Sequence, residues 1–126
     1  MSTAAQHPTE IRLRKSAGVL AVTFASGEKF ELPFEYLRVF SPSAEVSGHG
    51  PGQEILQIGK EHVKIIGVEP VGSYAVRLIF DDGHDTGLYS WPVLHDLGQN
   101  HEQNWTRYLK RLKDAGYQRK ENGLVR

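Results

Sequence analysis

The chain has 126 residues, of which 39% are hydrophobic and 24% are charged, and its formal net charge at pH 7 is zero. This length suits one domain with a modest core, and no window approaches the roughly 20 apolar residues that span a bilayer. The chain contains no cysteine, which excludes disulfides, thiolate metal sites, a cysteine nucleophile and an iron–sulfur cluster held by the protein's own thiolates. Because the first eight residues are small and polar, with no basic segment followed by an apolar one, we expect no signal peptide and a cytoplasmic protein.

The charges are unevenly distributed along the chain. Residues 40–100 carry three basic side chains and eight acidic ones, whereas residues 107–126 carry seven basic side chains and two acidic ones. Such an asymmetry can mark a surface that binds a partner, and a basic tail can contact phosphate. The alternative, which we favour, is a solvated helix face followed by a frayed terminus.

Three short antiparallel strands are predicted at the start of the chain. Residues 10–15 alternate apolar and charged side chains, which is the pattern of a half-buried strand, and residues 19–24 repeat it. A tight turn at residues 25–28 then leads to a return strand at residues 29–32. A proline at a first helical position predicts a short helix from Pro33 to about Phe40.

A loop and a second hairpin are predicted next. Residues 41–52 are rich in Ser, Pro and Gly, which favours a loop, and residues 53–58 are a candidate short strand. Residues 63–69 form a stronger strand pattern. Residues 74–80 and 85–90 are predicted to pair around a turn at residues 81–84.

The two hairpins share residues at a fixed offset. Three residues of the first recur 56 positions later in the second, namely Phe24, Gly27 and Leu32 with their counterparts Phe80, Gly83 and Leu88. In both hairpins the return strand runs into a short aromatic helical stretch. We therefore expect a repeated unit of strand, glycine turn, strand and short helix, whose two helical segments are neighbours in space.

Two helices are predicted to close the domain. The first covers residues 92–97 and ends at Gly98, and the second runs from about His101 to Ala115, with Asn100 and Gln103 forming a capping box. An apolar stripe with helical spacing is expected to face the sheet, and it consists of Trp105, Tyr108, Leu109 and Leu112.

The order of these elements predicts an α+β fold, with an antiparallel-rich sheet of two hairpin units and a C-terminal helix packed on one face. We expect one domain at residues 9–116, with flexible termini at residues 1–8 and 117–126.

The residues that carry chemistry gather in the second hairpin and in the loop before it. Asp82, His84 and Asp85 can coordinate a divalent ion, but Asp81, Asp82 and Gly83 also suit turn geometry, which is the interpretation we favour. If the loop approaches the hairpin, His49 and Glu45 come near His84 and form a site of carboxylate and imidazole groups. The sequence contains no phosphate loop, nucleophile elbow or HExxH motif.

Two segments of this chain carry a family resemblance. Residues 37–46 (LRVFSPSAEV) and 80–91 (FDDGHDTGLYSW) resemble the gamma-butyrobetaine hydroxylase-like N-terminal domain family, and the resemblance covers roughly residues 11–112. Members of this family are similar to the N-terminal module of 2-oxoglutarate-dependent carnitine-pathway hydroxylases. One is similar to a C-terminal appendage of a P-loop iron–sulfur carrier. The resemblance implies an accessory or interaction module, because no jelly-roll-length segment with an HxD triad follows.

The resemblance also bears on metal binding. In the hydroxylases this domain holds structural zinc through three cysteines and one histidine. His84 matches the histidine, but the cysteine positions fall near Ser41, Ser43 and Val46. Because serine is a poor zinc ligand and valine is none, we expect no bound metal and no cofactor, with His84 as the only retained ligand position.

We therefore predict a non-enzymatic accessory or protein-interaction module, linked to iron–sulfur cluster or cofactor metabolism. The alternative is a small metal- or ligand-binding protein or enzyme that uses His49 and His84. The predicted binding residues form an acidic, histidine-bearing patch on one edge and are Glu45, His49, Asp82, His84 and Asp85. Such a patch suits a basic protein surface or a transient cation and repels nucleic acid. We expect no membrane partner, while the identity of the protein partner and the oligomeric state stay open.

Overall fold

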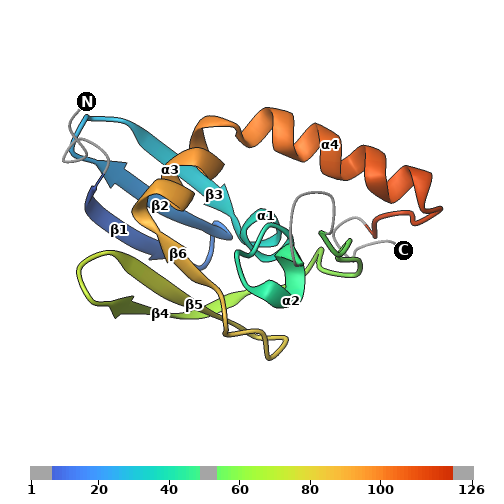
Figure 1. Cartoon of the computed structure of the whole chain (residues 1–126), viewed down its shortest axis with the longest axis horizontal. Helices are drawn as coiled ribbons and strands as arrows, with labels where there is room; N and C mark the ends of the chain where they lie inside the picture. The colour runs from blue at the N-terminus through green and yellow to red at the C-terminus, as the bar shows by residue number, and fades with distance from the viewer. Residues whose placement is uncertain (1–6, 49–53, 121–126) are drawn as a thin grey trace.

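The computed structural model describes residues 7–48 and 54–120 (Figure 1). Its strands are β1 (Pro8–Arg14), β2 (Val19–Phe24), β3 (Lys29–Pro33), β4 (Ile65–Val71), β5 (Ala75–Phe80) and β6 (Leu88–Ser90), and its helices are α1 (Phe34–Val39), α2 (Ala44–Ser47), α3 (Trp91–Gln99) and α4 (His101–Asp114). The strands form two antiparallel sheets in chain order, β1-β2-β3 and β4-β5-β6. The predicted α+β fold is confirmed, and each hairpin unit forms a three-stranded sheet of its own.

The two sheets repeat the same backbone hydrogen bonds at the turn between their second and third strands. The Phe24 N–H donates to the Glu28 carbonyl oxygen (2.8 Å), and the Phe80 N–H donates to the His84 carbonyl oxygen (3.0 Å). Both turns place a glycine at a positive φ, which is 96° in Gly27 and 92° in Gly83. Only glycine adopts this conformation without strain. The offset of 56 residues therefore corresponds to a repeated backbone structure.

The repeat changes in its last strand. Leu20 pairs with Leu32 across β2 and β3, whereas its counterpart Val76 pairs with Tyr89 across β5 and β6. The register has moved by one residue, and such a shift exchanges the two faces of a strand. Tyr89 is therefore buried in the core, while Leu88 is 43% exposed.

One hydrophobic core joins the two sheets. It contains alternate residues of both central strands, namely Leu20, Val22 and Phe24 of β2 and Val76, Leu78 and Phe80 of β5. Helices α1 and α3 contribute to the same core, and the Tyr36 hydroxyl of α1 donates to the Leu97 carbonyl oxygen of α3 (2.6 Å). The prediction that the two segments after the hairpins are neighbours is confirmed.

Gly98 lies within α3, so the prediction that it ends this helix is wrong. A Cβ atom at this position would lie 2.4 Å from Cγ of Phe30, which is too close for any side chain. Glycine at position 98 therefore allows α3 to approach β3 directly, and its role is close packing.

The apolar stripe of α4 packs on α1 and on the segment 54–58. Tyr108 and Leu112 are buried in a small cluster with Val39 of α1, and Trp105 is partly buried beside them. The stripe prediction is wrong for Leu109, which is 38% exposed. The predicted capping box is also wrong. The Asn100 side chain does not cap α4 and instead donates to the Asp96 carboxylate (2.8 Å).

The predicted loop at residues 41–52 contains the short helix α2. The Ser43 hydroxyl accepts a hydrogen bond from the Glu45 N–H (3.2 Å), which is an N-cap contact. Over residues 54–58 the predicted strand does not form, and this segment is irregular. The Ile55 N–H donates to the Val46 carbonyl oxygen (2.8 Å), which fixes the start of the segment against α2.

Part of the C-terminal tail contacts the domain. The Tyr117 hydroxyl donates to the Glu61 carboxylate (2.7 Å), and Arg119 forms an ion pair with Glu35 of α1. The domain limits and the flexible termini stay predictions. In the part of the chain that the structure describes, every helix is too short or too polar to cross a bilayer.

Candidate functional site

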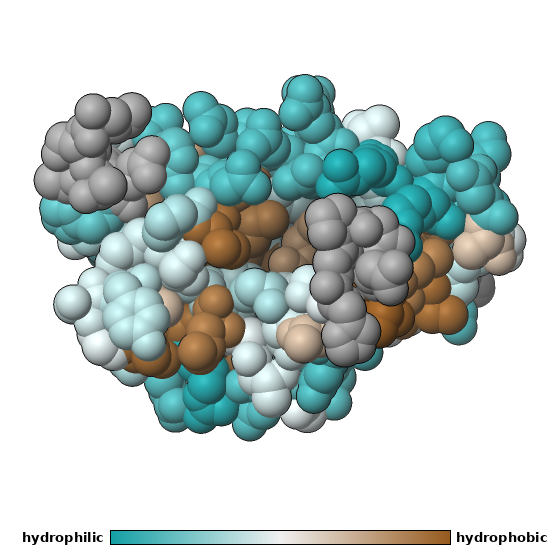
Figure 2. All heavy atoms as spheres, in the orientation of Figure 1, coloured by the Kyte–Doolittle hydropathy of each residue, from teal (hydrophilic) through white to brown (hydrophobic). Residues whose placement is uncertain are grey.

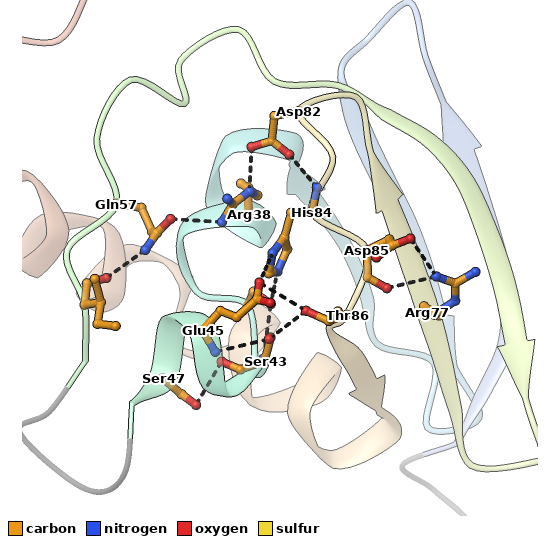
Figure 3. A network of polar contacts seen from close by, with 12 residues as sticks. Arg38, Ser43, Glu45, Ser47, Gln57, Arg77, Asp82, His84, Asp85 and Thr86 are labelled. Carbon is orange, nitrogen blue, oxygen red and sulfur yellow. Dashed lines mark hydrogen bonds and ion pairs between the residues drawn. The ribbon is translucent and has the colours of Figure 1, made fainter.

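The imidazole of His84 connects the β5–β6 turn to the segment that follows α1 (Figure 3). Its Nε2 lies 2.9 Å from the Ser41 hydroxyl, and its Nδ1 lies 3.2 Å from a carboxylate oxygen of Glu45. Beside it, the hydroxyls of Ser43 and Thr86 are 2.8 Å apart. The sequence expectation that Glu45 approaches His84 is confirmed. We call these five residues, with Arg38 and Asp82, the His84 network.

Asp82 binds two basic side chains at the edge of the network. Its Oδ2 lies 2.8 Å from Nε of Arg38 and 2.8 Å from Nζ of Lys60. The side chain of Arg38 is only 8% exposed, and its Nη1 also donates to the Gln57 side chain (3.1 Å). A buried guanidinium needs such a charged partner, because desolvation of an unpaired charge is costly. Asp82 therefore supports the fold as well as the surface.

Asp82 also shapes the turn that carries His84. Its Oδ1 accepts a hydrogen bond from the His84 N–H (3.1 Å), and Gly83 between them has a positive φ. Burial alone raises the pKa of Asp82, but hydrogen bonds from Lys60, from the His84 N–H and from Arg38 outweigh burial and lower this pKa to about 2. The interpretation of Asp82 and Gly83 as turn residues is confirmed.

The turn of the first sheet is held in the same way by a helix of the other unit. The Glu28 carboxylate lies 2.8 Å from Nε2 of His95 in α3, as Asp82 lies beside Arg38 in α1. Each hairpin turn therefore contacts the helix that follows the other sheet. We call this arrangement the reciprocal contact.

Burial favours the uncharged form of the His84 imidazole. Burial, and then the positive charge of Arg38, lower the pKa of His84, while the carboxylates of Glu45 and Asp82 act in the opposite direction. A neutral imidazole has one donor and one acceptor. Both contacts are satisfied when Nδ1–H donates to Glu45 and Nε2 accepts from the Ser41 hydroxyl.

The order serine, histidine and carboxylate is also found in hydrolases, but the surroundings of Ser41 do not suit a nucleophile. Ser41 is 2% exposed, and its Oγ already accepts a hydrogen bond from the Ser43 N–H (3.2 Å). A Cβ atom on Gly87 would lie 2.5 Å from this Oγ, so the backbone of residue 87 closes one side. The contacts of Ser41 join two segments and leave no room on that side for a substrate.

Comparison with known proteins gives the family of this chain. The family described as gamma-butyrobetaine hydroxylase-like, N-terminal, matches residues 11–95, which is more than half of the chain. The chain belongs to this family. No curated protein matches it.

Solved structures of similar proteins have the same fold. Two NMR solution structures have TM-scores of 0.78. One is 45% identical, with 100% of this chain and 97% of that chain covered, and the other is 44% identical, with 95% of each chain covered. A crystal structure of a protein with unknown function from Acidithiobacillus ferrooxidans, of the DUF971 family, has a TM-score of 0.65 and 41% identity, with 77% of this chain and 98% of that chain covered.

The gamma-butyrobetaine hydroxylase-like resemblance placed cysteine positions near Ser41, Ser43 and Val46. In this chain the two serine hydroxyls belong to the His84 network, and Val46 is buried. Across residues 7–48 and 54–120, no group of three His, Cys, Asp or Glu side chains is arranged to hold a metal ion. The expectation that the chain binds no zinc stays a prediction.

The side chains of the predicted binding residues do not all face the same way. Glu45, Asp82 and His84 lie together, and Glu45 is 66% exposed. Asp85 is 50% exposed and points away from them, toward Arg77 of β5 (3.2 Å; Figure 3). His49 lies outside the described residues.

Sequence reasoning missed the basic members of the site. Arg38 and Lys60 neutralise Asp82, so the predicted patch carries less negative charge in the structure than the sequence suggests. A signal for Arg38 was present, since it is a charged residue between the apolar Leu37 and Val39 in the helix FEYLRV. Lys60, Gln57 and Thr86 have no comparable signal in the sequence.

Proposed function

We propose that the chain is a non-enzymatic accessory module that binds a protein partner at the surface formed by α2 and the β5–β6 turn. The observation that carries this proposal is that the reactive side chains of the site are buried and paired with each other. Ser41 and His84 bond to one another, and Asp82 bonds to two cations. A nucleophile or a general base must be accessible to a substrate. A rigid protein-binding surface does not need accessible reactive groups.

Two carboxylates contribute negative charge to different sides of this surface, Glu45 next to His84 and Asp85 next to Arg77. Glu45 and Asp85 are at least half exposed, and each is fixed by a contact with the protein, to His84 and to Arg77 respectively. Fixed, exposed carboxylates suit a basic patch on a partner, where charge complementarity speeds association and selects the partner. The resemblance to the appendage of an iron–sulfur carrier favours a partner from iron–sulfur cluster or cofactor metabolism.

The alternative is a small enzyme or a ligand- or metal-binding protein that uses His49 and His84. We favour the interaction module because His84 is buried and both of its ring nitrogens have partners. Among the described residues, no contact of His84 favours an enzyme or a ligand-binding protein over the interaction module.

Binding to a partner tests the proposal. The tagged protein captures partners from a lysate of its source cells, and the strongest candidate is purified and measured by calorimetry. Glu45→Gln with Asp85→Asn should lower the affinity at least about 5-fold, since each rim charge contributes through complementarity. Affinity of the wild type should also fall as salt is raised.

The matched control is Glu102→Gln with Asp114→Asn, which removes two acidic charges from α4 and leaves the proposed surface unchanged. This control should bind like the wild type. Equal binding by the Glu45 and Asp85 variant would show that the surface is elsewhere. Turnover of a substrate that is abolished by His84→Gln would favour the enzymatic alternative.

A further inference from the structure

A cleft of about 470 Å³ lies between α1, α2, the segment 54–57 and α4. Its apolar lining includes Val39 and Val46, which are buried, and the side chain of Leu56. Figure 2 shows hydrophobic residues gathered below the C-terminal half of α4, where the segment 54–58 runs. The volume is within the range of small-molecule sites, which are typically about 300–1,000 Å³ and mostly apolar.

Two arginines of α4 line the same cleft. Arg107 and Arg111 are four residues apart on this helix, so they lie on one face of it. Within residues 7–48 and 54–120, Arg107 makes no hydrogen bond or ion pair. Arg111 donates to the Glu54 carbonyl oxygen (3.2 Å). Among the described residues that line the cleft, Glu54 is the one with a carboxylate side chain. The formal charge of this lining is therefore positive.

We propose that this cleft binds a small organic anion, with its apolar body on the valines and its carboxylate or phosphate at Arg107 and Arg111. Guanidinium groups bind both kinds of head group through paired, charge-assisted hydrogen bonds. An apolar floor with a few convergent polar groups is the usual composition of a small-molecule site. Neither Glu45 nor Asp85 lines this cleft, although Val46 and Ser47 of α2 do, so the two proposals are adjacent in space and are separated by variants at different residues.

NMR titration of the isotope-labelled protein with octanoate tests the proposal, and octyl phosphate serves as a second anionic probe. Saturable shifts are expected at Val39, Val46 and Leu56 with at least one of the two probes. The tighter-binding probe identifies the head group. Octanamide, which has the same apolar chain and no charge, should bind at least about 10-fold more weakly, since charge-assisted hydrogen bonds are the stronger kind.

Variants of α4 separate the cleft from general attraction to a basic helix. Arg107→Gln with Arg111→Gln should weaken anion binding at least about 10-fold. The matched control, Lys110→Gln with Lys113→Gln, removes the same charge from the same helix outside the cleft and should bind like the wild type. Arg107→Gln alone serves if the double variant does not fold, because Arg107 makes no hydrogen bond or ion pair among the described residues.

Three results would overturn the proposal. They are the absence of saturable shifts with both anions, equal binding of octanamide and the anions, and equal weakening by the arginine variants and the lysine control. Glu45→Gln with Asp85→Asn should leave anion binding unchanged, which separates this test from that of the partner surface.

Discussion

At the scale of single residues, Asp82 does more than its place in a surface turn suggests. It neutralises the buried Arg38, binds Lys60 and accepts the His84 N–H. Removing one partner of a buried ion pair leaves an uncompensated charge, whereas removing an exposed pair has little effect. Asp82 and Asp85, two of the three aspartates of the turn, should therefore differ in their contributions to stability.

We expect Asp82→Ala to lower the free energy of unfolding by about 3 kcal/mol, because Arg38 loses its buried partner. Asp85→Ala removes a half-exposed pair with Arg77 and should cost less than about 1 kcal/mol. Urea unfolding at pH 7 measures both. Equal losses in the two variants would show that the Arg38 pair has no special role.

The histidines give the fold a pH dependence. Burial lowers the pKa of His84 and of His101 in the folded protein, so the unfolded chain binds more protons near pH 6. Stability from these groups should be complete above the unfolded value of about 6.5 and should fall as pH drops toward the folded values. Unfolding in urea at pH 7.5, 6.5 and 5.5 measures this slope.

His84→Gln should reduce the slope, and adding His101→Gln should reduce it further. Asp82 does not act in this window, because its pKa of about 2 places its effect at lower pH. A slope that is the same in the wild type and in both variants would contradict the prediction.

At the scale of elements, α4 offers a direct comparison of two leucines. Leu112 is 2% exposed and Leu109 is 38% exposed, although the helical spacing places both on the predicted stripe. Leu112→Ala should cost about 3 kcal/mol through the cavity that it leaves. Leu109→Ala should cost less than about 1 kcal/mol, as partly exposed positions do. Thermal and urea unfolding of the two variants measure the difference, and similar losses would mean that α4 packs through a different face.

Gly98 supplies a second test at this scale. Alanine in place of glycine inside a helix normally stabilises it by about 1 kcal/mol. At position 98 the added methyl group meets the Phe30 ring, so Gly98→Ala should destabilise the protein by about 1 kcal/mol or more. Gly98→Ala with Phe30→Leu should recover part of the loss. A stabilised single variant would show that α3 can move away from β3 freely.

Local patterns predicted most of the strands and turns, with the strand expected at residues 53–58 as an exception, but they did not predict the side-chain contacts between these elements. The alternation of residues 19–24 and the glycine turns are properties of short segments, and they were predicted correctly. The N-cap of α2 at Ser43 was missed, because serine in a segment rich in Ser, Pro and Gly is equally typical of a loop. Asn100 matches a cap pattern, yet it bonds to Asp96, because a nearby carboxylate competes for the same side chain.

The candidate site was predicted only in part, because some of its contacts join residues that are distant in the sequence. The approach of Glu45 to His84 follows from the repeat, which places the segment after α1 beside the second hairpin. The burial of Arg38 depends on Asp82 and Gln57, which are distant in the sequence, so no local pattern reveals it. The contact between Gly87 and Ser41 likewise exists only in the folded chain.

At the scale of the whole molecule, the two sheets are held by contacts that cross from one unit to the other. The Tyr36 hydroxyl of α1 donates to the Leu97 carbonyl oxygen of α3, and the Tyr89 hydroxyl of β6 donates to the Leu37 carbonyl oxygen of α1. Both bonds are 2.6 Å long and buried. Neither unit can separate without exposing the core that both share.

The reciprocal contact resembles the contact between the two subunits of a two-fold homodimer. In such a dimer a surface patch of one subunit binds a different patch of the second, and the second returns the same contact. Here α1 binds the second turn through Arg38, and α3 binds the first turn through His95. Within one chain, this arrangement resembles the exchanged contact that such a dimer makes between two subunits, although Arg38 and His95 do not occupy equivalent positions of the 56-residue repeat. Among the described residues, the serine, histidine and carboxylate contacts of the candidate site involve the second turn, so the two halves of the chain share a backbone repeat and differ in the polar contacts of their turns.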